Sequence, residues 1–436
     1  MSLRPAAATR LPDARSREPA AIDLALAAAA GLLAFGLYLR TLAPGLLWGD
    51  SAEFQFAAWL GGFAHPTGYP LYLSLGWLWT HLLPWHDPAW RMNLFSAVWG
   101  ALATGLMYLL ALRLLAGVAR PAYRRLTALA AALVFAVTPT FWSQSIVAEV
   151  YSLHAVFVAA VLLALLSWAP HAAEPAGRGR ALLVAALYGL SLTHHRAMLL
   201  LAPAMLVFVW QTLRPVPMPT RRAVYSGGTL ALLLLCLLAP LALYLYIPLR
   251  ATAAPYYQIE LGAGETLALY DASFAGFIAH VTGSSFGGAL QIGAQTQAQI
   301  VGLWSRFTGE FTLLGVLLGL VGLLWTLVRP ARRRNPVTPL LVLTFLAIIA
   351  FNVVYGIGDI HVFFIPAYLV WSLWVALGAG ALARLLAAAP AAFRTHRAAA
   401  DEDVSGSGSP VHLLAPSLLL VLAVLLLGSP AVMAAG

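Results

Sequence analysis

Residues Ile22 to Tyr38 read IDLALAAAAGLLAFGLY, and the chain soon continues with Trp48-Gly-Asp-Ser-Ala-Glu-Phe54. The first stretch opens a series of apolar runs, each long enough to cross a hydrocarbon core of about 30 Å as a helix of roughly 20 residues. Backbone groups in such a core must pair internally, and no alternating β-barrel pattern appears. The runs therefore predict an all-α polytopic membrane protein. The second stretch sets two carboxylates at the edge of that membrane.

Composition supports a membrane protein and excludes several classes of function. Of the 436 residues, 61% are apolar and only 9% are charged, and the mean hydropathy is +0.84. This leaves too little polar surface to cover a soluble globule. The single cysteine, Cys236, excludes a disulfide or a thiolate metal site within the chain. The net charge of +9 comes from arginine alone, in short blocks between apolar runs, so we expect no nucleic-acid partner.

The positions of the arginines predict a topology with the N-terminus inside. We expect about 11 transmembrane helices, at 22–39, 92–117, 127–145, 152–169, 180–193, 197–213, 224–246, 311–328, 338–354, 362–386 and 412–428. Positive charge then concentrates on the inner side, as membrane proteins require. The arginines left outside are Arg40, Arg91, Arg196, Arg250 and Arg306.

This topology also predicts how the chain is organised. A basic cytoplasmic leader (1–21) precedes a transmembrane catalytic domain (22–400), whose large outer loops are 40–91 and 248–310. The apolar run 70–85 is placed in the first outer loop as a juxtamembrane helix, because a crossing there would put later basic loops outside. A flexible cytoplasmic linker (401–411) leads to the last transmembrane helix and a short tail (412–436).

Most polar residues without a topological reason fall on the outer face. Ionisable groups at a membrane edge are candidates for function, and a common depth is what a cavity at the boundary requires. We therefore expect these separated residues to converge. The set is Asp50, Glu53, His65, Glu149, His154, His194, His195, Arg196, Arg250, Asp359 and His361.

Asp50 and Glu53 have two compatible interpretations. As a helix start, Asp50 is the cap and Glu53, three residues later, completes a pair resembling a capping box. As chemistry, a carboxylate held at a helix start stays ionised, as a general base must. Capping alone explains the spacing but not the position at the membrane edge.

Four residues in two motifs are candidates for contact with a substrate. His65 and Tyr69 lie in AHPTGYP, where two prolines and a glycine predict a rigid turn. His65 could contact a phosphate or sugar, or satisfy carbonyls of the turn, and Tyr69 could be an interfacial anchor or a sugar contact. Glu149 and Tyr151 begin the fourth span in AEVYSLH, where an acid also suits a helix N-terminus.

The cationic candidates predict a site for phosphate. His194, His195 and Arg196 form a tight outer turn with up to three positive groups. A metal site there is less favoured, because adjacent helical side chains diverge. Arg250 closes the seventh span, where it could bind phosphate or extend to lipid headgroups.

A last outer turn, YGIGDIH, adds Asp359 and His361, which could contact a substrate; Asp359 could also pair with an arginine or meet the acceptor.

A carboxylate and cationic anchors at the outer leaflet suit group transfer from a phosphate-bearing lipid. If the group is a sugar, the carboxylate deprotonates the incoming hydroxyl, and displacement by one base predicts inversion at the anomeric carbon.

The motifs WGDSAEF, AHPTGYPLY, AEVYSLHA, THHRA, YIPLRA and GIGDIHVFFIPAY, in this order, resemble a bacterial membrane family related to the eukaryotic transmembrane protein O-mannosyltransferase. That family belongs to the GT-C glycosyltransferase superfamily. The resemblance implies a GT-C-like bundle and a polyprenyl-phosphate sugar donor, with mannose the leading choice. It also implies that Asp50 is the catalytic base, with Glu53 a second acid beside it.

Other features stay open at this level. The acceptor is a hydroxyl of a protein, a lipid or a glycan, and membrane lipid surrounds the protein. No cofactor is expected with certainty, and metal dependence is undetermined. The expected location is a bacterial inner membrane with the active site on the extracytoplasmic face. The alternative function is a transporter or lipid flippase, which would place polar groups at mid-bilayer depth and interrupt helices in both halves.

Overall fold

The computed structural model describes residues 19–116, 118, 121–251, 258–268, 270–328 and 335–398. Nearly all elements in these ranges are helices, and one two-stranded antiparallel hairpin joins them. Their bounds are α1 Ala21–Arg40, α2 Asp50–Leu60, α3 Pro70–Leu82, α4 Pro88–Leu114, α5 Pro121–Ala136, α6 Pro139–Ser145, α7 Tyr151–Trp168, η2 Ala169–His171, α8 Pro175–Leu192, η3 Arg196–Leu201, α9 Ala202–Leu213, α10 Met218–Val224, α11 Gly227–Leu238, η4 Ala239–Leu245, α12 Tyr246–Ala251, β1 Gln258–Gly262, β2 Glu265–Ala268, α13 Phe274–Thr282, η6 Ser284–Ala289, α14 Ala294–Val328, α15 Val337–Val354, η8 Ile360–Phe364 and α16 Ile365–Ala398.

The protein is an integral membrane protein with an all-α bundle, as expected. Within the described ranges, 8 helices are long and apolar enough to cross a membrane, or up to 9 if α5 and α6, bent by 69°, form one span. The expected count of about 11 is not reached. The segment 180–193 lies in α8, an arginine-bearing helix outside this group, and 412–428 lies outside the described residues. The proposed leader and linker also fall mainly outside them.

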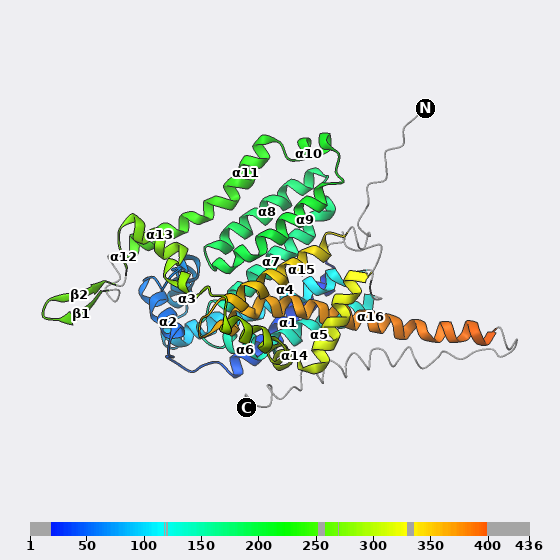
Figure 1. Cartoon of the computed structure of the whole chain (residues 1–436), viewed down its shortest axis with the longest axis horizontal. Helices are drawn as coiled ribbons and strands as arrows, with labels where there is room; N and C mark the ends of the chain where they lie inside the picture. The colour runs from blue at the N-terminus through cyan, green and yellow to red at the C-terminus, as the bar shows by residue number, and fades with distance from the viewer. Residues whose placement is uncertain are drawn as a thin grey trace.

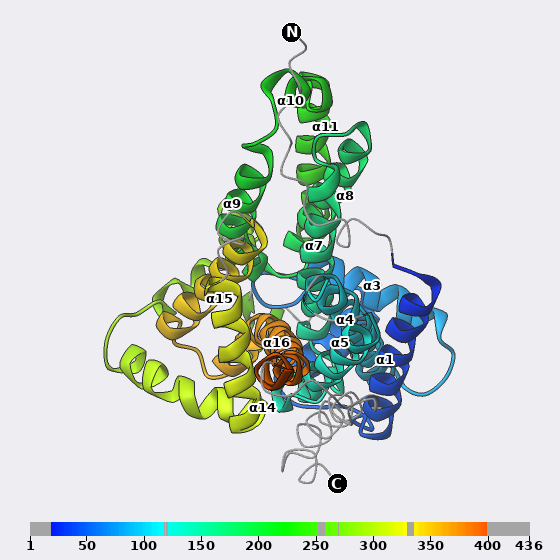
Figure 2. The same ribbon diagram turned by 90° about the vertical axis from the view of Figure 1, so that its right-hand side faces the viewer.

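The helices surround α16, whose membrane-crossing window is 94% buried inside the protein. It packs against α14 and α15 on one side and against α4, α5 and α7 on the other (Figure 2). Figure 1 shows α2, α3, α12 and α13 gathered at one end of the bundle, with the hairpin projecting beyond them. These segments belong to the two expected outer loops, so the outer end is the more elaborate one.

Local sequence explains the short outer helices. α2 ends at Gly61, whose left-handed φ of 59° closes the helix without the strain that a Cβ brings. α3 begins with Pro70 in its first turn, where a missing N–H costs nothing. With 13 residues, α3 is shorter than a span and suits the expected juxtamembrane position. Pro88 likewise opens α4, and Asp87 caps it by accepting the Trp90 N–H at 2.9 Å.

The second outer loop is more ordered than the sequence indicated. It holds the hairpin β1–β2, α13 and η6. It also holds the first half of α14, a helix of which only the span at 311–328 was expected. α14 departs from helical geometry at Thr312, with φ 57° and ψ 171°. This break separates an outer segment, 294–311, from the expected span.

Glycines let α14 and α16 approach closely. A Cβ added at Gly322 would lie 1.8 Å from the Trp374 carbonyl oxygen, and one at Gly378 would lie 2.0 Å from the Leu318 carbonyl oxygen. Gly319 of the GxxxG pattern meets the Trp371 ring in the same way. Close backbone approach is a main source of helix association in lipid.

We predict that Gly378→Val lowers the melting temperature of the purified protein in detergent, because overpacking costs about 1–3 kcal/mol and this clash is with backbone. Gly36→Val is the matched control, since a Cβ at Gly36 meets nothing within 4 Å. Equal melting temperatures for the two variants would contradict the role of this contact.

Candidate active site

A cavity of about 440 Å³, which we call the Asp50 cavity, lies at the outer end of the bundle. Its wall comes from the start of α2, the turn before α3, the start of α7, η3 and the segment before α16. These pieces are far apart in sequence, so the expected convergence is present in the structure. The candidate residues that line it are Asp50, His65, Tyr69, Glu149, Tyr151, His195, Arg196 and Asp359.

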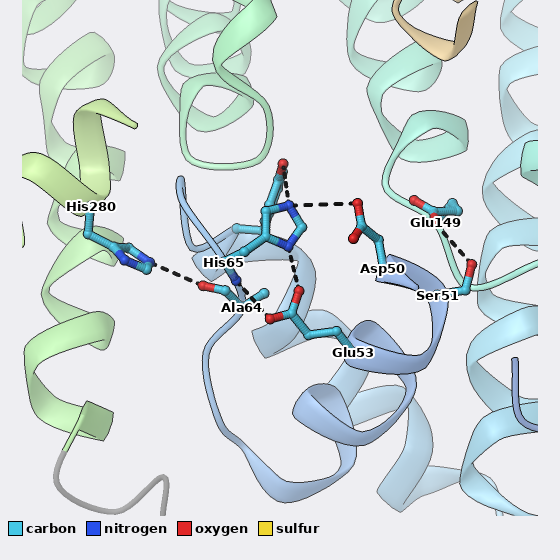
Figure 3. Close-up of polar contacts among 8 residues, drawn as sticks. Asp50, Ser51, Glu53, Ala64, His65, Glu149 and His280 are labelled. Carbon is cyan, nitrogen blue, oxygen red and sulfur yellow. Dashed lines mark hydrogen bonds and ion pairs between the residues drawn. The ribbon is translucent and has the colours of Figure 1, made fainter. Parts of the chain in front are cut away.

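Asp50, Glu53 and His65 form a chain of polar contacts on this wall (Figure 3). His65 donates from its backbone N–H to Glu53 Oε1 at 3.0 Å, and its Nδ1 contacts Glu53 Oε2. Its Nε2 lies 3.9 Å from Asp50 Oδ2. The capping-box interpretation is wrong. The N-cap of α2 is Gly49 and not Asp50, and no side chain caps the helix at that position. Glu53 instead holds His65 against Asp50.

Asp50, Glu53 and His65 shift the pKa values of their neighbours. Burial opposes a charge on His65, but the hydrogen bond and charge of Glu53, with the charge of Asp50, outweigh it and raise the His65 pKa. Burial also raises the pKa of Asp50 and the His65 charge opposes this shift, although the Asp50 side chain is 55% exposed. The like charges of Glu53 and Asp359 raise the Asp50 pKa further.

The same three residues are the one group in the described ranges whose ligand atoms, all within 4.8 Å of one another, could hold a metal ion. Two carboxylates and an imidazole are chemically suitable donors. In this structure, however, Glu53 and His65 use these atoms to bind each other.

The turn that carries His65 is fixed from several sides. Tyr69 occupies the left-handed region with φ 45°, and its ring packs edge-on against Phe54 at 5.3 Å. Its hydroxyl lies 3.4 Å from His65 Nε2. His280, in α13 of the second outer loop, donates from Nε2 to the Ala64 carbonyl at 3.1 Å (Figure 3). The second outer loop therefore holds the first.

Glu149 presents a different kind of carboxyl from Asp50. It lies just before α7, and Ser51 Oγ donates to its Oε1 at 3.0 Å (Figure 3). Burial raises the pKa of Glu149 to about 8, and the negative charge of Asp50 contributes in the same direction. The raised pKa favours the neutral form of Glu149, which can donate a hydrogen bond.

Of the up to three positive groups expected at 194–196, one is charged in the structure. Burial lowers the pKa of His194 to about 3 and that of His195 well below its ordinary value, so both rings are neutral. His194 does not line the cavity, and its Nε2 donates to the Val150 carbonyl at 2.9 Å. His195 Nδ1 accepts the Ala197 N–H, which assigns the proton to Nε2, an atom without a partner in the described ranges. Arg196 supplies the positive charge.

Two further candidates are not in the cavity. Arg250 donates to the carbonyls of Gly61 and Leu60. The last carbonyls of a helix lack intrahelical partners and favour a cation, so Arg250 completes the C-terminus of α2 and does not face the cavity. His361 is exposed at the start of η8 and lies outside the cavity wall, although its neighbour Asp359 is part of it.

Sequence reasoning missed residues that build the site without touching a substrate. Asn93 in α4 is fully buried, and its Oδ1 accepts from Gln55 Nε2 at 2.8 Å and from the Ala148 N–H at 2.9 Å. Ser96, one turn further, exchanges hydrogen bonds with the backbone of Glu149. Asn93 and Ser96 are polar residues within an apolar run, and this pattern could have identified them from the sequence. Nothing in the local sequence marked His280.

Part of the chain is similar in sequence to known proteins. Residues 50–215 match the family described as the Protein O-mannosyl-transferase TMEM260 N-terminal domain. The Protein O-mannosyl-transferase TMEM260 of Mus musculus is 38% identical over 122 residues, which are 28% of this chain and 16% of that protein. The Dictyostelium discoideum protein of the same name is 30% identical over 128 residues, 29% of this chain and 15% of its own. The chain thus spans less than a fifth of these relatives.

The expected resemblance to the O-mannosyltransferase family is confirmed. The crystal structure of ArnT from Cupriavidus metallidurans bound to undecaprenyl phosphate aligns with a TM-score of 0.55 at 15% identity, covering 93% of this chain and 70% of ArnT. The GT-C-like fold is therefore also confirmed. The TMEM260-like region, 50–215, contains the carboxylates Asp50 and Glu149 and the cation Arg196.

Proposed function

We propose that this protein is a membrane glycosyltransferase that moves a sugar, with mannose the leading choice, from a polyprenyl-phosphate donor to a hydroxyl acceptor. The transfer takes place on the extracytoplasmic face of a bacterial inner membrane, inverts the anomeric carbon and uses Asp50 as general base. The observation that carries the proposal is the composition of the Asp50 cavity, where an exposed carboxylate, one guanidinium and an apolar wall meet.

Each part of the cavity suits one part of such a donor. Leu199, Leu200, Phe286 and Phe351 supply the apolar wall that a polyprenyl chain requires. Arg196 has no ion-pair partner among the described residues, so its guanidinium is available for the phosphate. The neutral carboxyl of Glu149 can donate to a sugar hydroxyl, and the Nε2–H of His195 adds a second donor.

The reaction can be written with these groups. Asp50 removes the proton of the acceptor hydroxyl, and the oxygen attacks the anomeric carbon of the bound sugar. The bond from that carbon to the phosphate oxygen breaks, and polyprenyl phosphate leaves with the electron pair. Arg196 stabilises the charge that develops on the phosphate. Attack opposite the leaving group inverts the anomeric centre. His65 lies beside Asp50 and its positive charge favours the ionised base, while Glu53 orients His65.

The comparisons support the proposal in two ways. The relatives over the TMEM260-like region are named as protein O-mannosyl-transferases, and the ArnT structure was solved with undecaprenyl phosphate, a polyprenyl phosphate. The transporter alternative is less well supported, because it needs polar groups at mid-bilayer depth. Asp50, His65, Glu149 and Asp359 instead come from segments between the candidate spans.

The first functional prediction concerns the base. Asp50→Asn should reduce sugar transfer by roughly 10²–10⁴-fold, the usual contribution of general-base catalysis, with donor binding retained. Transfer of labelled mannose from undecaprenyl phosphate and binding of undecaprenyl phosphate are the two measurements. Asp271→Asn, in the second outer loop, is the control and should behave as wild type. Normal turnover by Asp50→Asn would remove Asp50 as the base.

The second prediction separates two arginines of the outer face. Arg196→Gln should weaken binding of undecaprenyl phosphate by roughly 10–100-fold, as the loss of a charged hydrogen bond implies. Arg250→Gln should leave that affinity unchanged and instead lower the melting temperature, because the α2 carbonyls lose their donor. Equal losses of affinity in the two variants would refute the assignment of phosphate to Arg196.

The third prediction is a pH profile. A base must be ionised, so activity is lost as the pH falls through the Asp50 pKa, which burial places above the ordinary Asp value. The charge of His65 lowers that pKa, so His65→Gln should move the acid limb of kcat to higher pH. His81 stacks on Trp59 and Trp77 and does not line the cavity, so His81→Gln should leave the acid limb in place. A shift to lower pH in His65→Gln would contradict this electrostatic role.

A further inference from the structure

Arg196 carries the positive charge of the Asp50 cavity, and its guanidinium packs against the second outer loop. It forms no ion pair within the described part of the chain, so the groups packed against it decide where its charge lies. One of them is Gly283, because a Cβ added there would lie 2.9 Å from Arg196 Nη2, 3.1 Å from Nη1 and 3.3 Å from Cζ. The guanidinium therefore occupies the space that a side chain at position 283 would take.

Gly283 ends α13 in a tight turn that continues into the cavity wall. It occupies the left-handed region, with φ 59° and ψ 41°, and its N–H donates to the His280 carbonyl at 3.1 Å. Its own carbonyl accepts the Phe286 N–H at 3.0 Å, and Phe286 lines the Asp50 cavity. The same turn thus contacts the cation and supplies part of the apolar wall.

His280, in the last turn of α13, ties this helix to the segment that carries His65. Its ring is buried and packs edge-on against Phe63, with the two ring centroids 5.7 Å apart. Its Nε2 donates to the Ala64 carbonyl, and Figure 3 shows His65 between His280 and Asp50. Burial lowers the pKa of His280 to about 4, so the buried ring stays neutral at neutral pH. α13 is therefore placed by the same turn that holds His65 beside the base.

We propose that Gly283 is a positioning residue for donor binding: its missing side chain leaves the place beside the α13–η6 turn from which the Arg196 guanidinium meets the donor phosphate. This rests on the proposed function and adds the element that sets its phosphate site. Gly283 does not line the cavity, so it acts through Arg196. Because Arg196 and the Ala64 carbonyl both meet the end of α13, one short helix places the cation and the turn beside the base.

A side chain at position 283 should displace the guanidinium without unfolding the protein. The three atoms nearest to an added Cβ are the far end of the Arg196 side chain, which can turn about several torsions. A displaced guanidinium keeps its charge but loses alignment, and hydrogen bonds weaken steeply as their angle departs from linear. The left-handed φ of Gly283 adds a separate cost for alanine, which calls for a control with the same backbone geometry.

The first measurement is binding of undecaprenyl phosphate, with the melting temperature taken in parallel. Gly283→Ala should weaken binding by roughly tenfold, as the loss of well-aligned charged hydrogen bonds implies. Gly264→Ala is the matched control, because Gly264 in the hairpin turn also has a left-handed φ, of 83°, but a Cβ there meets nothing within 4 Å. This control should bind as wild type does. Wild-type affinity in Gly283→Ala would overturn the assignment.

A double-mutant cycle separates positioning of Arg196 from support of the fold. In the Arg196→Gln background, Gly283→Ala should cause no further loss of affinity, because the guanidinium that the Cβ would displace is absent. A purely structural role of Gly283 would lower the affinity by the same factor in both backgrounds. Equal factors would therefore refute the positioning role, whatever the melting temperatures.

A third measurement needs neither donor nor transfer. Phenylglyoxal modifies accessible arginine side chains, and mass spectrometry of peptides gives the rate at each position. Gly283→Ala should raise the rate at Arg196 severalfold, whereas the rate at Arg250, which is bonded to the Gly61 carbonyl, is the internal reference. An unchanged rate at Arg196 would overturn the contact. Failure of the wild-type protein to bind undecaprenyl phosphate would instead refute the proposed donor, and the role of Gly283 with it, even where the Arg196 rate rises.

Discussion

The buried amide of Asn93 is the interaction on which the site depends. It lies in α4 with no exposed surface, and it joins three parts of the chain: its Nδ2 donates to the Ala43 carbonyl, and its Oδ1 accepts from Gln55 and from the Ala148 N–H. A polar group in an apolar core is costly unless every bond is made. The same bonds that satisfy Asn93 therefore set the start of α2, which carries Asp50, against the segment that carries Glu149.

This placement gives two carboxyls in one cavity different surroundings, although burial raises the pKa of both. Asp50 is half exposed and faces the positive charge of His65, which favours its ionised form. Glu149 is buried, receives one hydroxyl donor and has its pKa raised to about 8. The raised pKa of Glu149 favours a neutral carboxyl that can donate a hydrogen bond, beside an Asp50 whose ionised form the His65 charge favours. Glu53 contributes by keeping His65 charged and oriented, without lining the cavity itself.

The sequence predicted the bundle and the main cavity residues because hydrophobic length and arginine placement are local signals. It identified Asp50, Glu149 and Arg196, which are charges that a membrane edge does not need for topology. It misjudged Arg250, because the carbonyls that Arg250 satisfies belong to a helix almost 200 residues earlier. It also overestimated the charge at His194 and His195, since their burial depends on tertiary packing that no short window records. The order of the second outer loop was beyond reach for the same reason.

The segment from Tyr355 to Asp359 closes one side of the Asp50 cavity. Tyr355, Ile357 and Asp359 line the cavity, and Gly356, between the first two, lies against the Gln295 side chain of α14. The absence of a side chain at Gly356 also lets Gln295 pack directly on the backbone. Together with the hydrogen bond from the Gly356 N–H to the Ala289 carbonyl, this contact ties the part of the cavity wall that carries Asp359 to the second outer loop.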